Sequence, residues 1–147
     1  MTARIARRRL LLAAGAACGA VALARPGLAA ARIKLRDIYG KGAVFSDEAL
    51  ALADQAVEIQ GFMAPPLKPD APFFVLTRRP MAVCPFCDNE LDWPQDIVLV
   101  RLSSPQDWVD FNLPILVTGR LELGTEIDQE TGFVSRVRLV EAEYELA

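Results

Sequence analysis

Five short stretches of apolar, strand-forming residues, each followed by turn residues, dominate the sequence after residue 54. Their β-branched and aromatic content and their partial alternation predict strands rather than helices. The first two are separated by the proline-rich stretch 64–72, which neither a helix nor a central strand tolerates. A chain with this pattern has to bury its apolar residues in an all-β domain. The predicted strands are Gln55–Met63, Phe73–Arg79, Asp96–Leu102, Pro114–Leu123 and Phe133–Glu145.

Two short helices are predicted beside these strands. Ser46, followed by two acids, is a suitable N-cap for a helix that runs to Ala53. Ser104 and Pro105 have the residue types preferred at the N-cap and first position of a second helix, which runs to about Phe111. Three strands, a helix and two strands are the order of an OB-type barrel. The sequence therefore predicts a five-stranded OB-like barrel with one short helix between strands three and four. An open sandwich is the alternative.

The first 31 residues have the layout of a cleavable export signal. Four arginines precede the apolar stretch Leu10–Ala24, which is too short to span a bilayer comfortably, and Ala29–Ala31 forms an A-x-A cleavage site. The "RRRLL" motif and the mildly apolar, Ala-rich stretch are more typical of a twin-arginine signal than of a general secretory one, although both routes remain open. We therefore expect a periplasmic protein with a single mature domain, residues 32–147.

The mature chain is acidic. Five of the 16 basic residues lie in the signal, so 11 Lys and Arg face 19 Asp and Glu, a net charge of −8. This charge argues against binding nucleic acid or anionic lipid, both of which need a basic surface. The chain has no histidine, so a Ser-His-Asp triad is impossible and most hydrolase designs are excluded. The run of Glu126, Asp128 and Glu130 could bind a cation such as Ca²⁺, but a solvated turn is the commoner meaning of such a run.

The stretch "MAVCPFCDNELDWPQD", residues 81–96, holds the two cysteines that remain after cleavage. Thiolates at this Cys-x-x-Cys spacing can bind one Zn²⁺, but a structural zinc site needs four ligands. The further candidate ligands are carboxylates, because the chain has no histidine and no second cysteine pair. The candidate metal site thus consists of Cys84 and Cys87, with Asp88, Glu90 and Asp92, and also Asp96, as possible additional ligands.

Two other interpretations of the cysteine pair remain open. A disulfide between Cys84 and Cys87 would close a tight loop and add only modest stability. A thiol–disulfide enzyme would need the first cysteine at a helix N-terminus, whereas this pair lies between predicted strands and beside acids, which disfavour a thiolate. A metal site and a structural disulfide are therefore both favoured over redox catalysis.

Two segments, Gly61–Pro66 and Cys84–Cys87, give the chain its resemblance to a family of small exported bacterial proteins of uncharacterised function. The resemblance extends over about Leu35–Glu143. Relatives are often encoded near ABC-type transporters of the export-permease kind, some of them linked to zinc supply. The resemblance implies an accessory, non-enzymatic role in a transport or metal-handling system, with a membrane transporter or periplasmic binding protein as partner.

The chain departs from this family in the cysteine segment. Many relatives have Cys-x-His followed by a proline run, whereas this segment has Cys84-Pro85-Phe86-Cys87. If the relatives bind metal through that histidine, a metal site in this chain has to use Cys87 in its place. Zinc is therefore the expected cofactor only if both cysteines are available as thiolates.

Overall fold

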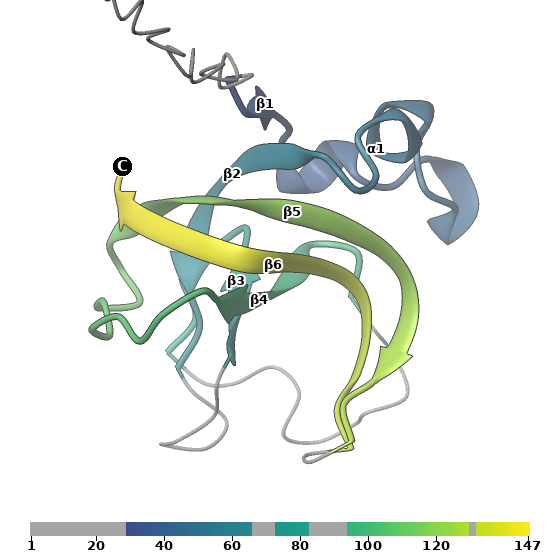
Figure 1. Ribbon diagram of the computed structural model, residues 1–147. Coiled ribbons are helices and arrows are strands. Elements are labelled where there is room, and N and C mark those ends of the chain that lie inside the picture. Colours follow the sequence, from purple (N-terminus) through teal and green to yellow (C-terminus); the bar gives the residue numbers. More distant parts are fainter. Residues whose placement is uncertain (1–28, 66–72, 83–93, 130–131) are drawn as a thin grey trace, which may run out of the picture.

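The computed structural model of the chain describes residues 29–65, 73–82, 94–129 and 132–147. They form one mixed sheet of six strands, preceded by short helical turns (Figure 1). No helix in these ranges is long and apolar enough to cross a lipid bilayer. The elements, in chain order, are β1 (Ala31–Arg32), the 3₁₀ turns η1 (Leu35–Asp37) and η2 (Lys41–Ala43), α1 (Asp47–Ala51), β2 (Ala56–Met63), β3 (Phe73–Thr77), β4 (Ile97–Leu102), β5 (Pro114–Ile127) and β6 (Val134–Leu146).

The prediction of an all-β domain is confirmed, and the five predicted strands correspond to β2–β6. The predicted number of strands, five, is wrong, because the sheet has six. The additional strand, β1, has two residues and pairs in parallel with β2, Ala31 with Val57 and Arg32 with Glu58. A strand this short has no alternation that a sequence pattern could reveal.

The strand order is β1-β2-β3-β4-β6-β5, with a further pairing between β2 and β5. That pairing runs from Ala56 opposite Arg120 to Phe62 opposite Pro114. The strands β2, β3, β4, β6 and β5 therefore form a closed cycle of pairings. Within this cycle only β4 and β6 are parallel; the other pairs are antiparallel.

Gly61 allows β2 to take part in two pairings at once. β2 pairs with β5 along most of its length and reaches β3 only at Phe62 and Met63. A Cβ on Gly61 would lie 2.7 Å from the carbonyl oxygen of Thr77 and 2.8 Å from Cγ of Leu76. Real Cβ atoms do not approach other atoms this closely, so only glycine fits where the backbones of β2 and β3 converge.

The strands β3 and β4 are buried on both faces. Phe74, Leu76, Val98 and Val100 belong to the main core, which also contains side chains of the other long strands. The alternate residues of β3 and β4 pack on the opposite face in a second cluster. Uninterrupted apolar runs such as "FFVL" and "IVLV" are typical of strands covered on both sides. The second cluster consists of Ala64, Phe73, Val75, Ile97, Leu99 and Phe133.

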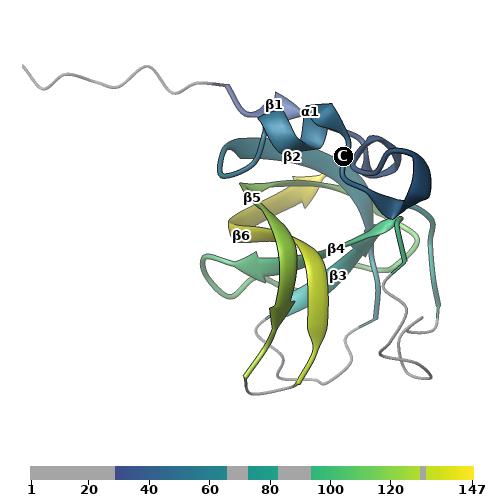
Figure 2. The same cartoon turned by 90° about the vertical axis from the view of Figure 1, so that its right-hand side faces the viewer.

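The segment 33–53 covers one end of the sheet, and Figure 2 shows α1 and β1 beside β2. Its helix α1 begins as predicted: Oγ of Ser46 accepts a hydrogen bond from the backbone N–H of Ala49 at 3.1 Å and donates one to the carbonyl of Asp37 at 2.6 Å. The segment is also held by β6, because the Arg136 guanidinium lies 5.7 Å and 5.6 Å from the ring centroids of Tyr39 and Phe45.

The predicted helix between the third and fourth long strands is absent. Residues 103–113, all of them described, form an extended connection with a turn at its end. Only Val109 of this connection packs against the main core, and Trp108 is 48% exposed. A helix of about two turns is not stable in water by itself, so without an apolar face to bury, the start signal at Ser104 and Pro105 is insufficient.

Candidate functional site

The five residues of the predicted metal site, Cys84, Cys87, Asp88, Glu90 and Asp92, lie outside the described residues, as does the predicted export signal up to residue 28. The structure describes the two strands that are connected by residues 83–93, which we call the cysteine segment. β3 leads into it through residues 78–82, and β4 follows it after residues 94–96. The structure therefore shows the residues on either side of the predicted site, 78–82 and 94–96, which we call the base of the cysteine segment.

Two contacts join the ends of the cysteine segment. The backbone N–H of Arg78 donates to the carbonyl of Asp96 at 3.2 Å, and the Arg78 side chain lies 4.0 Å from the Asp96 carboxylate. Both side chains are about two-fifths exposed, so this ion pair contributes little stability. The ion pair matters more for metal binding than for stability. Asp96, a candidate metal ligand, faces an arginine, and a neighbouring positive charge disfavours a metal cation at this carboxylate.

The buried hydroxyl of Thr77 fixes the direction in which the chain leaves β3. Its Oγ1 lies 2.8 Å from the carbonyl of Arg79 and 3.2 Å from the carbonyl of Phe62, and its single O–H is shared between these two acceptors. Thr77 is fully buried, so these bonds are shielded from water. The first residues of the cysteine segment therefore start from a defined position.

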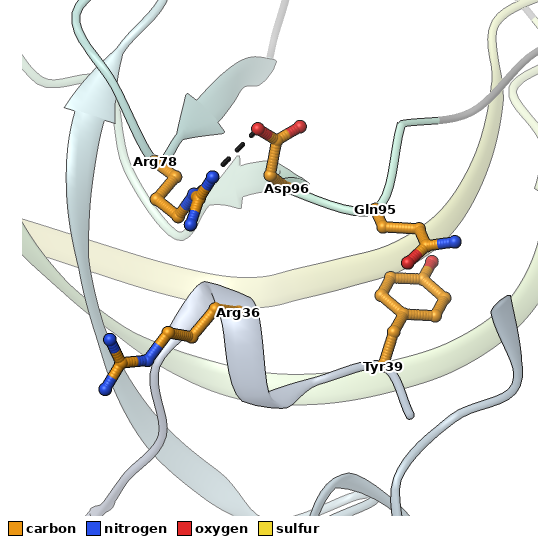
Figure 3. Close-up of a pocket in the computed structure, with 5 residues that line it drawn as sticks. All are labelled: Arg36, Tyr39, Arg78, Gln95 and Asp96. Carbon is orange, nitrogen blue, oxygen red and sulfur yellow. Dashed lines mark ion pairs between the residues drawn. The ribbon is translucent and has the colours of Figure 1, made fainter. Parts of the chain in front are cut away.

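An open hollow of about 310 Å³ lies beside this base (Figure 3). The N-terminal segment and the two ends of the cysteine segment meet here. Figure 3 shows Arg78 directed towards Asp96, with Gln95 above the Tyr39 ring and the Arg36 guanidinium turned outward. Each of the two arginines has a carboxylate nearby: Arg36 lies 3.5 Å from Asp37, and Arg78 lies 4.0 Å from Asp96. The lining residues are Arg36, Tyr39, Arg78, Gln95 and Asp96.

Sequence reasoning identified only Asp96 among these lining residues. Arg36 and Tyr39 lie about forty positions before Arg78, and no motif marks them. The sequence offered one signal for this site, which is the position of Arg78 and Gln95 close to the two ends of the cysteine segment. Both arginines of the lining are paired with carboxylates, so the hollow is a polar surface beside the cysteine segment without a net charge of its own.

The acid run that could have bound Ca²⁺ instead binds arginines. Glu126 accepts from Arg101 at 2.7 Å and pairs with Arg138 at 3.2 Å, and Asp128 accepts from Arg101 at 3.1 Å. Arg138 is 5% exposed and also donates to the carboxylate of Glu122. Glu130 lies outside the described residues. These carboxylates therefore connect the β5–β6 hairpin to Arg101 on β4 and to Arg138 on β6 through ion pairs.

The contacts with Glu126 and Asp128 also affect the pKa of Arg101. Burial alone would lower its pKa, but hydrogen bonds and charges from Glu126 and Asp128 raise the pKa above its ordinary value. The arginine is thus a permanent cation that holds two acids. Within the described part of the chain, no group of three Cys, Asp or Glu side chains is arranged to hold a metal ion.

Comparison with known proteins informs on the fold. No family model matches the chain, and no curated protein matches it. The chain is similar to the crystal structure of a DUF3299 family protein from Pseudomonas aeruginosa PAO1. The two share 14% identity with a TM-score of 0.54, over 81% of this chain and 97% of that one. At this identity the similarity concerns the fold alone.

Proposed function

We propose that the chain is an exported, periplasmic binding protein built on a five-stranded OB-like barrel, to which β1 is added. The closed cycle of pairings among β2, β3, β4, β6 and β5 supports the barrel, since each long strand then has a neighbour on both sides. The segment 33–53 takes the place of the expected helix as the cover of one end. In such a fold, function resides in the loops.

We further propose that the protein is a non-enzymatic accessory factor of a transport or metal-handling system and that Cys84 and Cys87 contact the metal. The observation that carries this proposal is the defined base of the cysteine segment. The Arg78–Asp96 backbone bond and the Thr77 hydroxyl fix where a loop with two thiols leaves the sheet. A binding loop needs such a support, because a fixed base reduces the entropy lost on binding.

The donor types fit zinc. Two thiolates at Cys-x-x-Cys spacing occupy two positions of a tetrahedral site, and Asp88, Glu90 or Asp92 can supply the others. Asp96 is the less suitable ligand, because the Arg78 guanidinium lies 4.0 Å from its carboxylate. A site with only two sulfur ligands suits metal transfer or sensing better than a structural role. The twin-arginine route would favour it, since the chain would fold in the reducing cytosol before export.

The test is mass spectrometry of the native exported protein, with metal content and free thiols measured on the same sample. We expect one zinc per chain and no disulfide. Replacing Cys84 and Cys87 with serine should abolish zinc binding, whereas Asp96→Asn should retain it. A stoichiometric disulfide without metal would refute the metal site and leave a binding module with a structural disulfide. A metal-free pair with a reduction potential well above about −300 mV would favour the thiol–disulfide alternative.

A further inference from the structure

Figure 1 shows the C-terminus of β6 at the end of the sheet away from α1. Large apolar side chains are exposed at this end. Trp108 is 48% exposed, Leu113 46% and Leu146 64%. Leu113 and Leu146 are brought to the same place by the sheet, because Leu146 pairs with Ile115 and the N–H of Ala147 donates to the carbonyl of Pro114 at 3.0 Å. Ile115 is fully buried, so Leu146 continues the inner face of the sheet into solvent.

The connection 103–113 is held against this end by one side chain. The amide nitrogen of Gln106 donates to the carbonyl of Tyr144 at 3.4 Å, and its oxygen accepts from the N–H of Tyr144 at 3.2 Å. The side chain thus occupies the position that a neighbouring strand would take beside this part of β6. Trp108, two residues further along, is thereby presented at the same end as Leu146.

The charged residues of the two chain stretches that form this end are all acidic. Residues 102–119 and 139–147 contain no lysine or arginine. Four acids in these stretches, Asp107, Asp110, Glu143 and Glu145, are exposed and have no ion pair with any described residue. The fifth, Glu141, lies 3.6 Å from Arg120. The end is therefore an apolar surface with an acidic rim, in which Arg120, near Glu141 and Glu143, is the neighbouring cation.

We infer that this surface docks a segment of another protein that carries basic side chains beside apolar ones. Apolar groups of the segment would cover Trp108 and Leu146, and its cations would neutralise the rim. A second copy of this chain would bring two acidic rims together, and an anionic membrane would be repelled. The inference goes beyond the proposed function, since it uses neither cysteine.

The experiment uses the mature chain and a fluorescently labelled peptide of lysine and leucine arranged as an amphipathic helix. We expect salt-sensitive binding, measured by anisotropy, that Trp108→Ser weakens by about tenfold or more. The double variant Glu143→Gln, Glu145→Gln should weaken it as well and reduce its salt dependence. Leu50→Ser removes a side chain of similar exposure, 53%, from α1 at the other end and should leave binding unchanged.

Several results would overturn the inference. These are the absence of binding, equal binding of a scrambled peptide, or equal binding by the Trp108→Ser variant when its unfolding curve is unchanged. Self-association that Trp108→Ser abolishes would assign the surface to a second copy, and adsorption to anionic vesicles would assign it to lipid. The variant with both cysteines replaced by serine should bind the peptide normally, so failure of the metal site would not count against the docking surface.

Discussion

At one end of the sheet, the segment 33–53 contributes five buried side chains to the core, whereas the connection 103–113 at the other end contributes only the partly buried Val109. Both segments contain a serine suited to begin a helix, and both have acids in the following positions. Only the first forms a helix. The difference shows that local start signals select where a helix can begin, while burial of an apolar face decides whether it forms.

The largest expected difference between the two ends is in core packing. Ile38→Ala at the covered end removes a fully buried side chain and should cost about 2–5 kcal/mol of the free energy of unfolding. Leu146→Ala at the open end removes a side chain that is 64% exposed and should change this free energy by at most about 0.5 kcal/mol. Urea unfolding of the two variants measures both values. Equal losses would contradict the distinction between a covered and an open end.

A smaller difference is expected at the two serines. Ser46→Ala removes the bond to the Ala49 N–H and should cost about 1 kcal/mol, the usual value of an N-cap. Ser104→Ala is the matched control, because this serine is exposed and begins no helix; its effect should stay within about 0.5 kcal/mol. Comparable losses in thermal or urea unfolding would mean that residues 104–111 form a helix in solution.

The smallest effect concerns the dependence of stability on pH at the open end. Burial, followed by the charge of Asp107, raises the pKa of Tyr144 above its ordinary value of 10.0. The unfolded chain then loses this proton at lower pH than the folded chain. The tyrosine's contribution to stability is therefore complete below pH 10 and is lost as the pH rises towards the folded-state pKa.

Tyr144→Phe should remove this part of the alkaline loss of stability, and Asp107→Asn should reduce it. Unfolding measured in urea at about pH 9, 10 and 11 gives the comparison. An identical pH profile in all three proteins would contradict a raised pKa of Tyr144, and a profile changed by Tyr144→Phe alone would show that the charge of Asp107 has no effect.

Much of the fold could be predicted from the sequence, because strand signals are local. The uninterrupted run from Ile97 to Val100 and the alternation around Ile59 each identify a strand without knowledge of its neighbours. The pairing order, the short strand β1 and the missing helix depend on contacts between distant segments. No local pattern shows that Ile33 and Ile38 would occupy the core.

The candidate site could be predicted only in part, for a similar reason. The cysteine spacing points to a loop with thiol chemistry, and this stays a prediction. The hollow at its base is formed by residues such as Arg36 and Arg78, which come together only in the folded chain. The partners of Glu126 were also hidden, since Arg101 and Arg138 reach it from two other strands.

The position of β6 has a consequence for how the protein is made. This strand, residues 134–146, is the last of the six described strands to be synthesised, yet it lies between β4 and β5 and pairs with both. Until it leaves the ribosome, β4 lacks one neighbour and the cycle of pairings stays open, with unpaired strand edges exposed. A nascent chain stalled before residue 134 cannot complete the sheet, so folding has to wait until residues 134–146 have left the ribosome.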